Sequence, residues 1–242
     1  MKESAPAPWS VGVVVPAQNE ESTIERCIES IRAAACAGAV GGRLWIVVVA
    51  DACADATASR ARRALGTSGE VIECTARSPG VARKIGAAAV LAHFAACNPE
   101  RLWLANTDAD THVPADWLIL HLEWANEGVS AVAGIVQLEP GAAERRSVTQ
   151  LFRATYELAS DGTHEHVHGA NFGVRADAYL DVGGWSHVRL AEDHCLWRRL
   201  RAAGWSLRSS ARSVVVTSAR LYGRAAGGFA DTLRARLDAA CG

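Results

Sequence analysis

A long apolar run is absent from this sequence of 242 residues. No uncharged apolar stretch approaches the ~18 residues that a membrane span requires. The first ten residues also lack the basic segment followed by an apolar stretch that is typical of a signal peptide. We therefore expect a cytoplasmic protein without an integral membrane segment.

An excess of one charge and a paired cysteine motif are also absent. The 25 basic and 26 acidic residues give a net charge of −1, which provides no general attraction for nucleic acid or anionic lipid. We expect no nucleic-acid partner, and any anionic ligand must be bound locally. The seven cysteines are never spaced as Cys-x-x-Cys, which argues against a zinc site and against the disulfide framework of a secreted protein.

Apolar residues make up half of the chain, enough for one core, and we expect a single domain over residues 1–242. The predicted strands of the first half are residues 11–15, 44–50, 71–72 and 102–105, and each is followed by a predicted helix. Four such units predict an α/β fold with a mostly parallel central sheet flanked by helices. After Gly128 the pattern loosens, with strands expected near residues 129–138, 170–174 and 214–216 and helices near 145–160 and 192–203. Pro114 fits the first turn of the helix after the fourth strand.

Polar and acidic segments follow three of these strands, at residues 16–20, 51–55 and 106–111. In an open parallel sheet, ligands bind outside the carboxyl ends of the strands. Asp108 and Asp110 are the strongest signal, because two carboxylates separated by one small residue can face one hard divalent cation. The alternative is that aspartate simply favours turns and helix caps. Their position directly after a buried strand favours a site for Mg²⁺ or Mn²⁺.

The sequence resembles the inverting glycosyltransferases of the GT-A fold, the family 2 type of nucleotide-diphospho-sugar transferase. The resemblance covers residues 11–184 and the acidic pair that follows, which is most of the chain. The opening Pro-x-x-Asn-Glu of the family is matched by Pro16, Asn19 and Glu20. Asp51 stands where the family has an acid that contacts the nucleotide base, and Asp108 matches its metal-binding Asp-x-Asp. These residues imply a donor-binding half at about residues 11–112.

A basic pair, Arg83 and Lys84, is similar to the family's helix segment beside the nucleotide, although a solvated helix face is the commoner fate of such a pair. Arg220 and Arg224 follow the last predicted strand. They could meet the diphosphate if the glycine-containing C-terminal segment closes. As surface arginines they would need no function.

The acceptor-side half, at about residues 113–226, is implied by a second group of matches. Gly169, Ala170 and Asn171 resemble the acceptor-side segment of the family. Glu192 and Asp193 match its acidic pair, in which the second acid is generally the catalytic base. From the residues alone, two acids in a first helical turn also complement the helix dipole, by ~0.3–1 kcal/mol, without any catalytic duty.

Two aromatic candidates complete the acceptor side. His164, His166 and His168 alternate, and in a strand they would share one face. The preceding residues 161–163 indicate a loop, which favours acceptor contact or a polar loop without a ligand over a second metal site. His168, nearest to Gly169, is the candidate for acceptor contact. Trp185 follows two glycines and is the tryptophan that we consider for stacking on a sugar, although core packing is the default role of this residue type.

The resemblance implies a metal-dependent enzyme that moves a sugar from a nucleoside diphosphate sugar to a small-molecule, lipid or peptide acceptor. The Gln-x-x-Arg-Trp motif of processive synthases is absent, so we expect transfer of a single sugar. Two alternatives stay open. A nucleotidyltransferase of similar fold would have glycine and lysine in the first loop, where residues 16–20 have neither. A non-catalytic nucleotide-sugar binding protein would not need Asp193.

Overall fold

A computed structural model describes residues 8–38, 40, 43–139, 158–186 and 191–218. Its strands are β1 (Ser10–Ala17), β2 (Leu44–Asp51), β3 (Gly69–Cys74), β4 (Leu102–Asn106), β5 (Thr111–His112), β6 (Ala131–Leu138), β7 (Phe172–Arg175) and β8 (Leu207–Thr217). Its helices are α1 (Ile24–Ala37), α2 (Thr57–Leu65), α3 (Pro79–His93), α4 (Trp117–Asn126), α6 (Ala176–Asp181) and α7 (Glu192–Ala202), with the short 3-10 helices η2 (Pro99–Arg101) and η3 (Gly169–Asn171). None of these described helices is long and apolar enough to cross a membrane.

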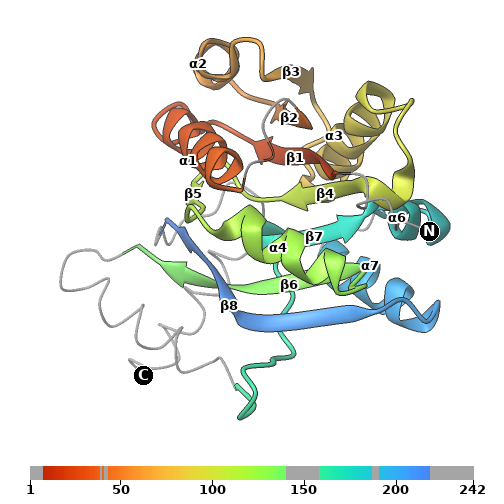
Figure 1. Cartoon of the computed structure of the whole chain (residues 1–242). Coiled ribbons are helices and arrows are strands. Elements are labelled where there is room, and N and C mark those ends of the chain that lie inside the picture. Colours follow the sequence, from red (N-terminus) through yellow and green to blue (C-terminus); the bar gives the residue numbers. More distant parts are fainter. Residues whose placement is uncertain (1–7, 39, 41–42, 140–157, 187–190, 219–242) are drawn as a thin grey trace.

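The eight described strands form one mixed sheet in the order β3-β2-β1-β4-β7-β6-β8-β5 (Figure 1). The first four strands in this order are parallel to one another. β7 is antiparallel to β4 and β6, whereas β6 is parallel to β8, and the short β5 is antiparallel to β8. The predicted α/β fold with helices around a central sheet is therefore confirmed, and its parallel part is the half that the sequence pattern shows most clearly.

Helices cover both faces of the sheet (Figure 1). Helices α1, α2 and α4 pack on one face, and α3, α6 and α7 pack on the other. Within β1, Val13 and Val15 join the first core and Val14 joins the second, because successive side chains of a strand point to opposite faces. Both faces of this strand are covered, which explains why its sequence is a continuous apolar run.

Helix α3 packs closely against the sheet at Gly86. A Cβ atom on Gly86 would lie 2.4 Å from Cγ1 of Val14, so only glycine permits this approach. At the start of the helix, Oγ of Ser78 accepts a hydrogen bond from the backbone N–H of Val81 at 3.4 Å, the usual role of an N-cap serine. Arg83 lies three residues before Gly86 and so on the same side of the helix, toward the sheet.

Some predicted boundaries differ from the structure. Helix α4 begins at Trp117, and Pro114 belongs to the turn before it, where its carbonyl accepts a hydrogen bond from the Trp117 N–H at 3.1 Å. Strand β5 was not predicted, because two residues carry no periodicity. The predicted helix at residues 145–160 lies outside the described residues except for 158–160, which are not helical.

Candidate functional site

Hydrogen bonds join the two loops that follow β1 and β2 at the carboxyl edge of the sheet. The Asn19 Oδ1 accepts from the backbone N–H of Ala54, and the N–H of Glu20 donates to Oγ1 of Thr57, both at 2.7 Å. Asn19 has a φ of 55°, a left-handed conformation that asparagine tolerates better than most residues. Asn19 and Glu20 therefore hold the loops together, just beyond the end of β1, in which Pro16 is the second-last residue. Donor contacts by these three residues stay predictions.

Asp51, the last residue of β2, shapes the turn that leads into α3. Its two carboxylate oxygens accept hydrogen bonds from the backbone N–H groups of Arg77 and Ser78, each at 2.8 Å. The residue is only 4% exposed. Asp51 thus has a structural role, and its contact with a nucleotide base stays a prediction.

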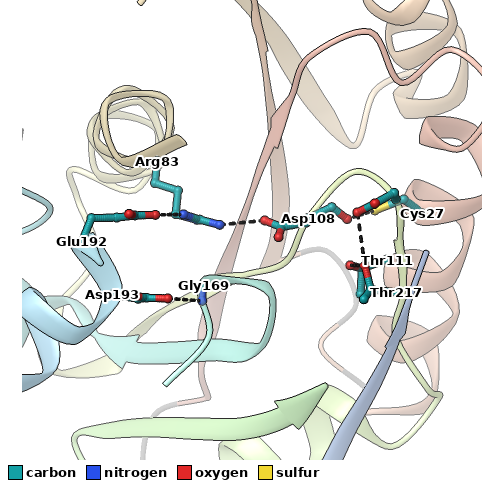
Figure 2. A network of polar contacts seen from close by, with 9 residues as sticks. Cys27, Arg83, Asp108, Thr111, Gly169, Glu192, Asp193 and Thr217 are labelled. Carbon is teal, nitrogen blue, oxygen red and sulfur yellow. Dashed lines mark hydrogen bonds and ion pairs between the residues drawn. The ribbon is translucent and has the colours of Figure 1, made fainter. Parts of the chain in front are cut away.

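Arg83 lies at the centre of the polar network of the site (Figure 2). Its Nη2 donates to Oδ1 of Asp108 at 2.7 Å, and its Nη1 donates to Oε1 of Glu192. Burial opposes the charge, but Asp108, Glu192 and Asp193 together raise the pKa of Arg83 above its ordinary value. With a side chain that is 5% exposed, Arg83 is a buried cation and not part of a solvated helix face. Lys84 is half-buried on the same helix, and its donor contact stays a prediction.

The two acids of the Asp-x-Asp motif lie between β4 and β5 and face different partners. Asp108 faces Arg83, whereas Asp110 accepts a hydrogen bond from Oγ1 of Thr217 at 3.2 Å. The hydroxyls of Thr111 and Thr217 lie 3.0 Å apart. Sγ of Cys27 lies 3.4 Å from the backbone carbonyl of Asp108 and donates a hydrogen bond to it. These contacts fix the loop at both acids.

The motif is open to a cation and its ligands. The Asp108 side chain is 36% exposed, and Asp110 lines a cavity of about 60 Å³. No group of three His, Cys, Asp or Glu side chains in the described residues could bind a metal. Two carboxylates fit Mg²⁺ or Mn²⁺ nonetheless, because such cations commonly take one or two carboxylates and complete their shell with phosphate and water oxygens.

The acidic pair begins helix α7, as predicted. Asp193 is half-buried, and its Oδ2 accepts a hydrogen bond from the backbone N–H of Gly169 at 2.9 Å. Its Oδ1 accepts from the N–H of His194 at 2.7 Å. Two backbone donors therefore orient the proposed base, while Glu192 beside it pairs with Arg83.

Two residues of the proposed acceptor segment are core residues, which corrects the prediction. Oδ1 of Asn171 accepts from Nε1 of Trp117 at 2.9 Å, and its Nδ2 donates to the carbonyls of Ile135 and Ser213. Because these partners use the buried amide fully, Asn171 is not available to an acceptor. Ala170 packs in the hydrophobic core.

Trp185 requires the same correction. Its side chain is 1% exposed, and its ring packs against Phe172 with the ring centroids 5.5 Å apart. Cζ of Arg83 lies over the same ring, 5.6 Å from its centroid. The indole is thus covered by protein and cannot stack on a sugar in this structure. Trp185 is therefore a core residue, which is the usual role of a buried tryptophan.

His168 lies half-buried directly before Gly169. Burial and the nearby His166, His194 and His164 lower the pKa of His168 to about 3, so its imidazole is neutral. The rings of His166 and His168 stack, with centroids 5.9 Å apart. A cavity of about 380 Å³ lies at the other end of this histidine row, and its lining includes Thr163, His164, Glu165, His166, Arg201 and Ser209. Acceptor contact by His168 stays a prediction.

The site predictions included two arginines that cannot be placed and omitted one threonine that lies in the site. Arg220 and Arg224 lie outside the described residues. Thr217 was not predicted, although its contact with Asp110 places it in the site. Thr217 could have been found from the sequence, because it directly follows the apolar run of β8. The acids were identified in the same way, from their position at the carboxyl ends of predicted strands.

Comparisons of the sequence and of the structure with known proteins both find glycosyltransferases. A sequence profile of glycosyl transferase family 2 matches residues 12–183. The mannosyltransferase PcManGT from Pyrobaculum calidifontis, in complex with GDP-Man and Mn²⁺, is similar with a TM-score of 0.65 at 21% identity, over 88% of this chain and 58% of that chain. No curated protein sequence matches the chain.

Two further solved structures share the fold. TarS 1-349 from S. aureus has a TM-score of 0.63 at 14% identity, over 86% of this chain and 60% of that chain. GalNAc-T7 with UDP, GalNAc and Mn²⁺ has a TM-score of 0.62 at 13% identity, over 88% of this chain and 44% of that chain. The chain thus spans about three fifths or less of each of these three structures.

Proposed function

Because the chain belongs to glycosyl transferase family 2, we propose that it moves a single sugar from a nucleoside diphosphate sugar to an acceptor hydroxyl, with inversion at the anomeric carbon. The chain is a glycosyltransferase of the GT-A fold. One observation carries the finer proposal: Arg83 brings Asp108, on the donor side, together with the acidic pair at the start of α7. Asp108, which would bind the metal and the sugar donor, thereby lies near Asp193, the proposed base, although the two are far apart in the sequence.

The donor side is the carboxyl edge of the parallel strands. Asp51 and the joined loops around Asn19 would bind the nucleoside, at the place where such sheets bind ligands. PcManGT was solved with GDP-Man and GalNAc-T7 with UDP, which supports a nucleoside diphosphate here. The half-buried Lys84 would approach the phosphates, as would Arg220 and Arg224.

Asp193 would act as the general base. It would take the proton of the acceptor hydroxyl while that oxygen forms a bond to the anomeric carbon. The bond from this carbon to the diphosphate oxygen breaks, and its electron pair leaves with the nucleoside diphosphate. The hydrogen bonds from Gly169 and His194 hold the carboxylate for this task, and neutral His168 adds no competing charge.

Asp108 and Asp110 would hold the metal through their carboxylates. Mg²⁺ or Mn²⁺ bound there would neutralise charge on the departing diphosphate. Both PcManGT and GalNAc-T7 were solved with Mn²⁺. Thr217 would orient Asp110 through its hydroxyl, and Arg83 stands beside Asp108.

Calorimetric titration of UDP and GDP, with Mn²⁺ or with chelator, tests the donor and metal assignments together. We expect one of these nucleotides to bind the parent protein more tightly with Mn²⁺. We expect Asp110→Asn to lose that Mn²⁺-dependent gain and to stay folded, because the amide oxygen still accepts from Thr217. The matched control is Asp116→Asn, an exposed acid at the start of α4, which should behave like the parent.

Equal Mn²⁺ stimulation in Asp110→Asn and the parent would contradict the metal assignment. If neither nucleotide binds under any condition, the donor assignment fails for these bases. A nucleotide-sugar panel that binds but is never cleaved, with or without added acceptors, would instead favour a non-catalytic binding protein.

A further inference from the structure

Arg83 balances a concentration of negative charge inside the site. Its guanidinium bonds directly to Asp108 and Glu192, and Asp193 also acts on its charge. The Arg83 side chain is 5% exposed and that of Glu192 is 11% exposed, so water screens this pair little. Removing one partner of such a buried pair leaves an uncompensated charge.

The surroundings hold the guanidinium in place. The Trp185 ring lies beneath it, 5.6 Å from Cζ. On another side is Gly169, where a Cβ atom would come within 2.5 Å of Cζ. The absence of a side chain at residue 169 thus makes room for Arg83, while the N–H of the same residue binds Asp193. Arg83 is consequently fixed by elements of both predicted halves of the chain.

The ion pair with Asp108 conflicts with a metal at the same carboxylate. Nη2 of Arg83 lies 2.7 Å from Oδ1 of Asp108, and Mg²⁺ bound to Asp108 would lie ~2.0–2.1 Å from a carboxylate oxygen. Two positive charges would then share one carboxylate at close range, which costs free energy unless further negative charge arrives. A nucleoside diphosphate brings that negative charge.

We propose that Arg83 is a positioning residue that neutralises Asp108 and Glu192 in the donor-free enzyme and thereby makes metal binding depend on the diphosphate. Without the donor, the guanidinium compensates the acids and the metal binds weakly. With the donor, the phosphate charge offsets the repulsion, and metal and nucleotide bind cooperatively. The inference rests on the proposed function, because it takes Asp108 and Asp110 as the metal-binding acids. It assigns Arg83 a role through Asp108 rather than a direct contact with phosphate.

Electron paramagnetic resonance of Mn²⁺ without nucleotide tests whether Arg83 weakens or strengthens the binding of Mn²⁺. We expect Arg83→Gln to bind Mn²⁺ about tenfold more tightly than the parent, because it removes the competing charge. The ratio of Mn²⁺ affinities with and without the nucleoside diphosphate should fall by a similar factor. A residue with only a structural role, or one that binds phosphate, would not tighten metal binding when removed. The control is Arg175→Gln, which removes an arginine paired with Asp177 at the end of β7.

A second variant keeps the test decisive if Arg83→Gln is unfolded. Glu192→Gln leaves Arg83 with Asp108 as its ion-pair partner and should weaken binding of Mn²⁺ alone, the opposite sign. Its matched control is Asp193→Asn, which removes the same charge from the next residue, whose carboxylate bonds to Gly169 and His194. The loss in Glu192→Gln should exceed that in the control at least threefold.

The outcomes separate the two ideas. If Asp110→Asn abolishes Mn²⁺-dependent nucleotide binding but Arg83→Gln binds Mn²⁺ no more tightly than the parent, the Arg83 inference is overturned and the proposed metal site stands. If Arg83→Gln is unfolded, equal losses in Glu192→Gln and Asp193→Asn overturn the inference. If Asp110→Asn has no effect on Mn²⁺, the metal site itself is wrong, and the inference falls with it.

Discussion

At the scale of single residues, the orientation of Asp193 comes from backbone groups. Its two oxygens accept from the N–H groups of Gly169 and His194 at 2.9 and 2.7 Å. A carboxylate at a helix start can serve the helix dipole alone. Here one of its partners, Gly169, belongs to η3, a separate element that also borders Arg83. The side chain is therefore positioned by the site and not by its own helix alone.

We expect Asp193→Asn to lower turnover by ~10²–10⁴-fold, the usual contribution of a general base. The amide has nearly the shape of the carboxylate but cannot take a proton. Nucleotide affinity should change little. Release of nucleoside diphosphate from the sugar donor measures the loss, in single-turnover experiments with an acceptor or, more slowly, with water.

A control acid distinguishes catalysis from helix stability. Asp181 ends α6 and accepts a hydrogen bond from Nε1 of Trp205 at 2.9 Å, so Asp181→Asn is a matched change outside the site. Turnover of Asp193→Asn within about threefold of this control would reject the general base, whose expected contribution is at least ~10²-fold.

At the scale of elements, the segments after β1 and β2 form one hydrogen-bonded unit. The loop after β1 and the loop after β2 exchange hydrogen bonds in both directions: Asn19 accepts from Ala54, and the Glu20 N–H donates to Thr57. The N–H of Glu21 also donates to Asp55 at 3.1 Å. Both loops lie at the edge of the sheet where a nucleoside would bind. We therefore expect the hydrogen bonds between them to shape the proposed nucleoside site.

We expect Asn19→Ala to lower the free energy of unfolding by ~1–3 kcal/mol. It removes the acceptor of a hydrogen bond, and it places alanine at a φ of 55°, a conformation that costs ordinary residues ~1–2 kcal/mol. Urea denaturation measures the change, and nucleotide affinity should fall with it.

Asn19→Gly separates the two causes. Glycine adopts a positive φ readily, so this variant loses the hydrogen bond without the backbone strain. It also makes the unfolded chain more flexible, but it should still be less destabilised than Asn19→Ala. Equal losses in both variants would contradict a net stabilising effect of relieving the strain.

At the scale of the whole molecule, the sequence predicts what depends on local pattern. The buried strands β1, β2 and β4 are apolar runs, and the acids of the site follow their ends, so the fold and the location of Asp108 could be predicted. The roles of Asn171 and Trp185 could not. Asn171 is buried because Trp117 and Ser213, distant in the sequence, meet its amide. A motif match identifies a residue but not its partners, and the partners decide whether its side chain faces ligand or core.

Two histidines with lowered pKa values make the stability of the whole fold depend on pH. His121 of α4 is fully buried, and its Nδ1 accepts from Nε1 of Trp103 at 3.3 Å. Burial lowers the pKa of His121 to about 3. The pKa of His168 is likewise lowered to about 3, against ~6.5 for a histidine in the unfolded chain.

Both shifts have the same consequence for stability. Between pH ~6.5 and ~3 the unfolded chain binds protons at these histidines that the folded protein does not, so the free energy of unfolding falls as the pH is lowered. The stabilisation from neutral imidazoles is fully present above pH ~6.5. Each histidine contributes a slope of up to ~1.4 kcal/mol per pH unit within this window.

We expect His121→Asn to reduce this pH dependence by the share of one histidine, up to ~1.4 kcal/mol per pH unit. The asparagine side chain still offers an acceptor to Trp103 but does not titrate. The smaller side chain leaves a cavity, so the variant should be less stable than the parent at pH 7, and the two stability curves should converge as the pH falls toward 4. Urea denaturation at intervals from pH 7 to pH 4 measures both effects. Parallel curves would mean that the pKa of His121 is the same in the folded and unfolded states, and they would contradict this prediction.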